Sequence, residues 1–140
     1  MQENENKRLA RRWFEEVINQ GKVELIDELT DAGYVEHELT VPDLPKGKEG
    51  LRALIELYRS AFPDVKTTVE DILAEGDRTV VRTRWQGTHK GEFQGLQPTG
   101  KKFDAQSIDI LRWRNGKTVE HWGVTDQLAM MQQLGTVPTQ

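Results

Sequence analysis

Hydrophobic residues in the first 62 positions recur mainly at the spacing of amphipathic helices. One stripe predicts a helix over residues 5–20, followed by a glycine suited to the left-handed position past a helix end. Helical spacing also predicts a short helix over 22–29 and a longer one over 48–61, which a proline ends. Residues 34–37 read as extended, and 41–47, with two prolines and a glycine, predict a loop. The first stripe consists of Leu9, Trp13, Phe14, Val17 and Ile18.

The second half of the chain changes to a period of two, which is typical of strands. Strands are predicted over 65–73, 79–85, 102–114 and 118–125, and an Asn-Gly pair at 115–116 is a strong hairpin signal. A short helix over residues 127–134 follows. Helices followed by a meander of antiparallel strands predict an α+β fold. A curved sheet wrapped around the helical layer would form a cone whose mouth is a small-molecule pocket.

Composition narrows the classes of function. The 140 residues predict a single domain over 1–140. The net charge of −4 argues against nucleic acid as a partner, since phosphate binding needs a clustered basic surface. The chain has no cysteine, which excludes a thiol nucleophile, and it has no apolar run that could span a membrane. We therefore expect a cytoplasmic protein with no membrane partner.

Asp126 is the first candidate for chemistry. It alternates with Trp122 and Val124 on the last strand, and because those two residues are apolar, their face is predicted to point inward. Burial would raise the pKa of the Asp126 carboxyl and suit it to proton transfer near neutral pH. His121 lies on the opposite face and reads as structural. The alternative is that Asp126 caps the helix that follows it.

The three histidines, His37, His89 and His121, each lie near the end of a different predicted element. Any of them could pair with Asp126 and tune its proton affinity, and the alternative for each is a surface or loop position. No helical or hairpin ligand spacing supports a three-histidine metal site, so we expect no metal. Dinucleotide and nucleophile-elbow motifs are absent, which predicts no cofactor.

Six motifs occur in an order that covers nearly the whole chain. They are Tyr34-Val35-x-His37, Gly47-x-x-Gly50, Ala61-Phe62-Pro63-Asp64, Gly87-Thr88-His89-x-Gly91, Gly95-x-x-Pro98-Thr99-Gly100-Lys101 and Gly116-Lys117-x-x-Glu120-His121-Trp122-x-x-x-Asp126. Together they resemble the SnoaL-like polyketide cyclases, or ester cyclases. The resemblance implies the cone-shaped barrel of nuclear transport factor 2. It also implies homodimers or homotetramers associated through the sheet.

The resemblance implies an intramolecular aldol condensation without metal or cofactor. Asp126, by motif the family's late aspartate, would remove a proton alpha to an ester carbonyl, and the enolate would attack a ketone. An apolar or aromatic small molecule is the implied substrate. The resemblance makes Asp126 the catalytic group, and His89 and His37 are the expected substitutes for the family's histidine, which is absent beside Gln106. The substrate is expected to contact Tyr34, Phe62, Trp85, Gln106 and Trp122.

Two other functions are compatible with the same fold. A binding module would hold an apolar metabolite without chemistry, and the lack of a histidine beside Gln106 favours it. An epoxide hydrolase or a related isomerase would need two carboxylates bridged by an arginine. Asp109, Arg112 and Asp126 are the candidates, but Asp109 and Arg112 point to opposite faces of a regular strand.

Overall fold

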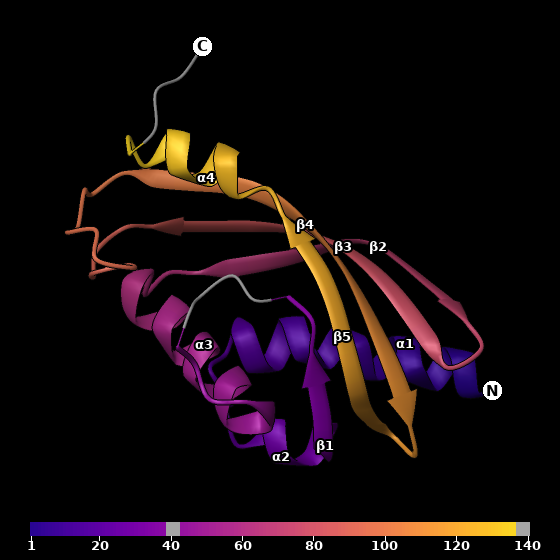
Figure 1. Cartoon of the computed structure of the whole chain (residues 1–140). Helices are drawn as coiled ribbons and strands as arrows, with labels where there is room; N and C mark the ends of the chain where they lie inside the picture. The colour runs from indigo at the N-terminus through magenta and orange to yellow at the C-terminus, as the bar shows by residue number, and fades with distance from the viewer. Residues whose placement is uncertain (39–42, 137–140) are drawn as a thin grey trace.

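The computed structural model describes residues 1–38 and 43–136. These residues form four helices, one π-helical segment and five strands (Figure 1). In chain order they are α1 (Gln2–Arg12), η1 (Trp13–Ile18), α2 (Leu25–Leu29), β1 (Thr30–Glu36), α3 (Gly47–Ala61), β2 (Lys66–Glu75), β3 (Arg78–Thr88), β4 (Lys102–Arg114), β5 (Lys117–Thr125) and α4 (Gln127–Gln133).

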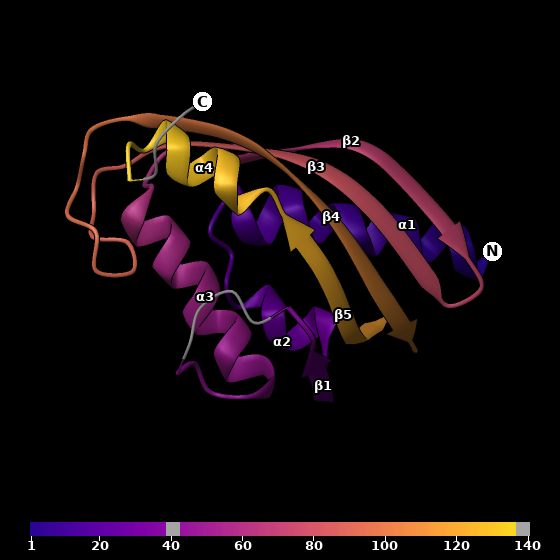
Figure 2. The same cartoon turned by 45° about the horizontal axis from the view of Figure 1, so that its top comes forward.

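One mixed sheet organises the fold, with the strand order β1-β5-β4-β3-β2. β2 to β5 form an antiparallel meander, and β1 joins the edge of β5 in parallel. Figures 1 and 2 show that the long strands curve over α1 and α3, which lie on the concave side of the sheet. This is the predicted α+β cone.

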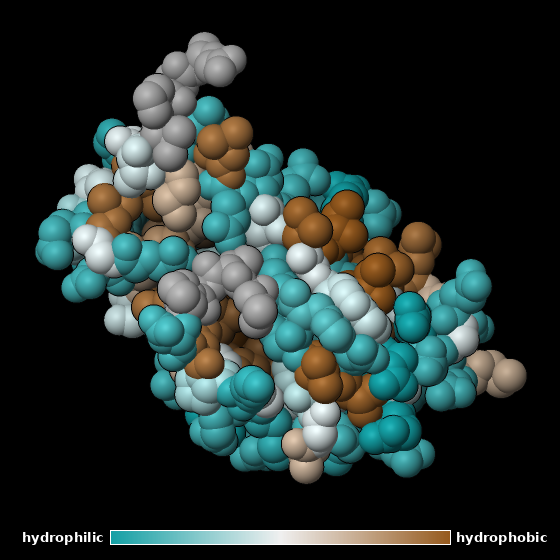
Figure 3. Space-filling model, viewed as in Figure 1, coloured by the Kyte–Doolittle hydropathy of each residue, from teal (hydrophilic) through white to brown (hydrophobic). Residues whose placement is uncertain are grey.

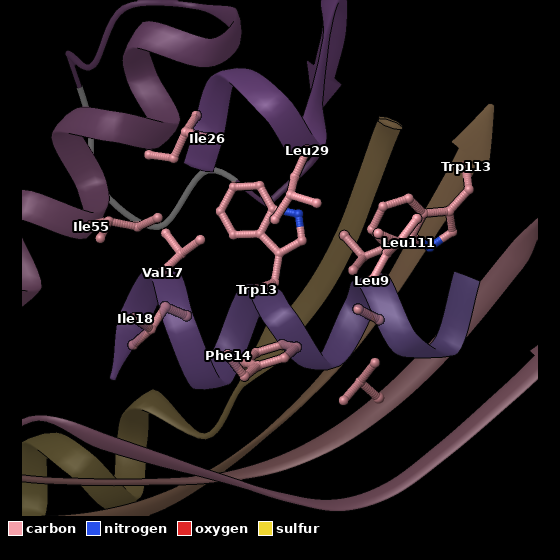
Figure 4. Close-up of a cluster of buried hydrophobic side chains, with 12 residues drawn as sticks. Leu9, Trp13, Phe14, Val17, Ile18, Ile26, Leu29, Ile55, Leu111 and Trp113 are labelled. Atoms are coloured by element: carbon pink, nitrogen blue, oxygen red, sulfur yellow. The ribbon is translucent and has the colours of Figure 1, made fainter. Parts of the chain in front are cut away.

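The main core lies between the N-terminal helices and the concave face of the sheet. Figure 4 shows side chains of α1 and η1 directed toward α2 and α3 on one side and toward β4 on the other. Val17, Ile26 and Ile55 belong to this cluster, as do Leu9 and Leu111. The π-helical segment widens the turn that carries Trp13 to Ile18, a distortion that often accompanies functional sites.

A second cluster closes the other end of the cone. Phe62 is fully buried there, with its ring centroid 4.8 Å from that of Phe103 and 5.2 Å from that of Phe93. Met130 of α4 and Leu134, at the C-cap of that helix, complete the cluster. The terminal helix is therefore held to the sheet by the apolar residues of one face.

Most predicted elements are confirmed. The strand predicted over 102–114 matches β4, and Asn115 and Gly116 form the expected turn with positive φ angles. The expected helix over 5–20 is divided between α1 and η1, and β1 begins at Thr30, earlier than residue 34. Residues 41 and 42 of the predicted loop lie outside the described residues. No helix in the described ranges is both long and apolar enough to cross a membrane.

The predicted facing of the last strand is wrong. Val124 is 75% exposed and Asp126 is exposed, whereas His121 points to the concave side. Val124 pairs across the sheet with Ile108, which is also half exposed. The convex face of the sheet therefore carries apolar residues, so hydrophobicity alone pointed to the wrong face of β5.

We predict that Phe62→Ala lowers the free energy of unfolding by about 3–5 kcal/mol, because it removes a fully buried ring from the second cluster. Urea unfolding followed by circular dichroism measures the loss. Leu128→Ala, at a side chain that is 60% exposed on α4, is the control and should change stability by less than about 0.5 kcal/mol. Equal losses in both variants would contradict this account of the core.

Candidate functional site

A pocket lies between the helices and the concave face of the sheet. Its walls are largely apolar and come from η1, α3, α4 and the long strands. The apolar lining includes Trp13, Phe14, Leu51, Leu54, Ile55, Trp85, Phe103 and Met130. Such walls favour an apolar ligand, since its burial removes apolar surface from water on both sides.

One side of the pocket carries ionisable groups, centred on His121. Its Nε2 lies 2.7 Å from Oδ1 of Asp109, and its Nδ1 is hydrogen-bonded to Oε2 of Glu36. The three residues belong to β5, β4 and β1, which are neighbours in the sheet. His121 and Glu36 are about four-fifths buried, and Asp109 is buried. We call these three residues the ion array.

The ion array fixes the charge of His121. Burial by itself would lower the pKa of this imidazole, but the hydrogen bonds to Asp109 and Glu36 outweigh it and raise the pKa to about 10. Burial acts against ionisation of Glu36, yet His121 lowers the pKa of the Glu36 carboxyl overall. His121 is therefore an imidazolium at neutral pH, held between two acceptors.

Hydroxyl groups surround the ion array. Tyr34 donates to Oε1 of Glu36 at 2.7 Å, and Ser107 donates to Oδ2 of Asp109 at 3.0 Å. Burial, followed by the charge of Glu36, raises the pKa of Tyr34 well above its usual value, so its hydroxyl remains a donor. The carboxylate oxygens that do not meet His121 are thus held as well.

Gly123 makes room for this arrangement. A Cβ at this position would lie 2.5 Å from Oδ1 of Asp109 and 2.9 Å from Oε1 of Glu38. Both distances are shorter than a carbon can tolerate, so any side chain at residue 123 would displace the carboxylates. The site therefore requires a small residue at this inward-facing position of β5.

The structure places Asp126 away from the pocket. It is exposed, and its Oδ1 accepts a hydrogen bond from the backbone N–H of Ala129 at 3.1 Å. This is the geometry of an N-cap for α4, which confirms the capping interpretation. The acid/base role of Asp126 stays a prediction.

The expected partners of Asp126 lie elsewhere. His37 is exposed, pairs with Glu120 at 2.8 Å and stacks on Trp122 with ring centroids 4.9 Å apart. His89 is buried beside Phe62, and its Nδ1 lies 3.1 Å from the Thr99 hydroxyl. Neither histidine lines the pocket.

Two of the five residues expected to contact substrate, Tyr34 and Trp85, line the pocket. Phe62 belongs to the second cluster, and Gln106 and Trp122 lie on the convex side of the sheet. The expected opposition of Asp109 and Arg112 is confirmed, because Asp109 points into the pocket and Arg112 pairs with Glu120 outside it. That separation argues against the epoxide-hydrolase arrangement.

Sequence reasoning missed Glu36 and Glu38. Glu36 is the last residue of β1, and Glu38 lies two positions beyond it. Both carboxylates line the pocket. Glu36 meets His121 across 85 positions of the chain, a contact that no local spacing can predict. The available signal was weak: two glutamates flank His37 with strand alternation.

Among residues 1–38 and 43–136, the group that could hold a metal is Glu38, Asp109 and His121, whose ligand atoms lie within 4.8 Å of one another. A ring nitrogen binds a metal only after losing its proton, and both nitrogens of His121 face carboxylates that hold the imidazolium form. The arrangement fits an ion array better than a metal centre.

A curved sheet over helices, with an apolar pocket that ends in buried ionised groups, defines a class of α+β cones that enclose small molecules. Residues 8–134 match the SnoaL-like polyketide cyclase family. The chain belongs to this family, whose members share the nuclear transport factor 2-like fold.

Curated relatives are ester cyclases. The chain is 30% identical over 134 residues to the aklanonic acid methyl ester cyclase DauD of Streptomyces sp. (strain C5), covering 91% of this chain and 80% of DauD. It is 23% identical over 120 residues to the nogalonic acid methyl ester cyclase of Streptomyces nogalater, covering 84% of this chain and 89% of that enzyme.

Solved structures agree with the fold. TsrD from Streptomyces laurentii superimposes with a TM-score of 0.86 and 28% identity, over 96% of this chain and 97% of TsrD. A candidate polyketide cyclase from Bacillus cereus ATCC 10987 gives a TM-score of 0.83 and 32% identity, over 96% of this chain and 83% of the other.

The ion array predicts a pH dependence of stability. The pKa of His121 is raised to about 10 in the folded protein from about 6.5 in the unfolded chain, so its contribution is complete below pH 6.5 and is lost as pH rises toward 10. In this window the free energy of unfolding should fall by at most about 1.4 kcal/mol per pH unit.

Urea unfolding of the wild type and of His121→Asn at several pH values between 6.5 and 9.5 measures this slope. The decline should be absent in His121→Asn and should persist in His37→Asn, which removes an exposed imidazole paired with Glu120. A decline of equal slope in wild type and His121→Asn would show that His121 is not its source.

Proposed function

We propose that this protein is a cofactor-independent cyclase-type enzyme that acts on an apolar, aromatic small molecule bearing an ester. Membership of the SnoaL-like family supports the class of reaction, and two relatives are named as cyclases of polyketide methyl esters. The apolar walls of the pocket suit fused aromatic rings, and Trp85 and Phe103 offer faces on which such rings can stack.

The single observation that carries the proposal is the buried ion array at one side of an apolar pocket. An intramolecular aldol condensation needs a base for the carbon alpha to the ester and stabilisation of the oxyanions that follow. Carboxylates beside His121 supply the first requirement, and a carboxyl that has taken up the proton supplies the second by returning it to the alkoxide. We infer that the acid/base group is one of the pocket carboxylates at or beside the ion array rather than Asp126, which is exposed and caps α4.

Paired variants test this assignment. We expect Asp109→Asn to lower kcat by about 10²–10⁴-fold, because it removes a carboxylate from the ion array and leaves His121 with one carboxylate partner. Asp126→Asn should keep turnover within a few-fold of the wild type, since an asparagine oxygen can also cap α4. Turnover of aklanonic acid methyl ester and nogalonic acid methyl ester is followed by product chromatography, and ligand binding by the melting temperature.

The outcomes separate the alternatives. Loss of turnover in Asp126→Asn alone would return the acid/base role to Asp126, as the family resemblance implies. A saturable melting shift in the wild type with the ester recovered unchanged would indicate a binding module. Absence of both a product and a melting shift with either ester would contradict the proposed substrate class.

We also propose that the protein associates through the convex face of its sheet, as a homodimer or homotetramer. This face carries Leu73, Ile108 and Val124, which are 66%, 50% and 75% exposed. Ile108 and Val124 are direct neighbours in the pairing of β4 with β5. Figure 3 shows hydrophobic surface gathered over these strands. Pairing with a second copy would remove this apolar surface from water.

We predict that Ile108→Glu and Val124→Glu each convert the oligomer into monomers, because each puts a carboxylate that must be desolvated into the proposed contact surface. Sedimentation velocity at several protein concentrations measures the change. Leu128→Glu, at an exposed apolar residue of α4, is the matched control and should leave the oligomer intact. A monomeric wild type at all concentrations would contradict association through this face.

A further inference from the structure

Glu38 is the third carboxylate of the pocket, and it lies two positions after Glu36, just beyond the end of β1. Atoms of Glu38, Asp109 and His121 that could bind a proton or an ion all lie within 4.8 Å of one another. Glu38 therefore lies beside the ion array, next to Gly123, where the absence of a side chain leaves room for its carboxylate.

In the described part of the chain, the ion array uses the cation that Glu38 could pair with. His121 has two ring nitrogens, and both are engaged, one by Glu36 and one by Asp109. Within residues 1–38 and 43–136, no lysine, arginine or histidine forms an ion pair with Glu38. Its side-chain donor is the Thr125 hydroxyl, at a long 3.3 Å from Oε2. Arg59, which also lines the pocket, instead donates to the backbone carbonyls of Ile18 and Asn19.

The groups that face Glu38 come from four elements. Glu36 and Tyr34 on β1, Asp109 on β4, His121 on β5 and Tyr58 on α3 are the ionisable ones. Burial raises the pKa of Glu38, Asp109 and Glu36 raise it further, and His121 and the Thr125 hydroxyl act against them. The net direction is upward, opposite to the direction for Glu36. Two glutamates, two positions apart, thus differ in their affinity for a proton, which is a common basis for assigning acid and base roles.

We propose that Glu38 is the group that takes and returns the proton in the reaction, while the ion array keeps its charges throughout. This inference rests on the proposed function for its chemistry, but the placement of the proton on Glu38 can be tested without substrate.

The proton cycle balances within the pocket. An oxygen of ionised Glu38 takes the proton from the carbon alpha to the ester carbonyl, and the electrons of the C–H bond form the enolate. The enolate carbon then bonds to the ketone carbon, whose C=O electrons move to oxygen as an alkoxide. Glu38 returns its proton to that alkoxide. The product is an isomer of the substrate, and no oxidant, reductant or metal takes part in the step.

A titration tests where the proton binds. In protein carrying ¹³C-labelled glutamate, carboxyl chemical shifts are followed by NMR from acid to neutral pH. We expect one glutamate carboxyl to titrate above the others in the wild type and its signal to vanish in Glu38→Gln. The same signal should remain in Glu56→Gln, which alters an exposed glutamate on α3. Absence of a high-titrating glutamate, or its persistence in Glu38→Gln, would overturn the proposal.

Kinetics test the role of that proton. Glu38→Gln keeps the shape of the side chain and should lower kcat by about 10²–10⁴-fold, with little change in KM. The acidic limb of the pH–rate profile, set by ionisation of the base, should also disappear. Glu56→Gln should match the wild type in both respects, and a melting curve confirms that each variant folds. Full activity in Glu38→Gln would refute the role.

The two proposals fail in different ways. A wild type that converts neither ester would contradict the proposed function, whereas the NMR titration would still decide whether Glu38 holds the proton. Conversion by the wild type that is lost in Asp109→Asn and retained in Glu38→Gln would uphold the enzyme and overturn the role of Glu38.

Discussion

The rest of the site depends on one buried imidazolium, His121, held between Glu36 and Asp109. It connects three neighbouring strands, including the parallel edge strand β1. Buried ion pairs are weak contributors to stability, because desolvation offsets much of the attraction, yet removing one partner is costly. The ion array matters mainly for its effect on the pocket. It holds the positive charge of His121 in place, and it engages both ring nitrogens, so that His121 cannot also pair with another carboxylate.

This arrangement of charges also depends on a glycine. Gly123 withholds the side chain that would occupy the space in front of Asp109 and Glu38. The carboxylates of Asp109 and Glu38 occupy that space instead, so these acidic side chains of the pocket come from β4 and from the chain just beyond β1. Trp85 and Phe103, on neighbouring strands, keep the adjacent wall apolar, which strengthens every electrostatic interaction at the ion array.

Local patterns predicted the elements well because each depends on neighbours in the sequence. The alternation over 102–114 and the Asn-Gly turn after it correspond to β4 and its hairpin. The site was predicted less well, for a physical reason. Hydrophobicity placed Val124 inside, but the convex face of this sheet carries exposed apolar residues among its ion pairs, and the concave face carries the ion array beside the core. The contact of His121 with Glu36 depends on the parallel pairing of β1 with β5, which no local signal in the sequence reveals.

The two faces of β5 therefore carry separate constraints. Its outward residue Val124 is apolar although it faces solvent in the single chain, which is understandable if another copy covers it. Its inward residue His121 is charged although it is buried, which is tolerated because two carboxylates meet it. In a strand patterned for stability alone, the apolar residue would face inward and the charged residue would face solvent. On the two proposals above, the inversion puts the chemistry on the concave face and association on the convex face, and a one-residue shift of register would destroy both.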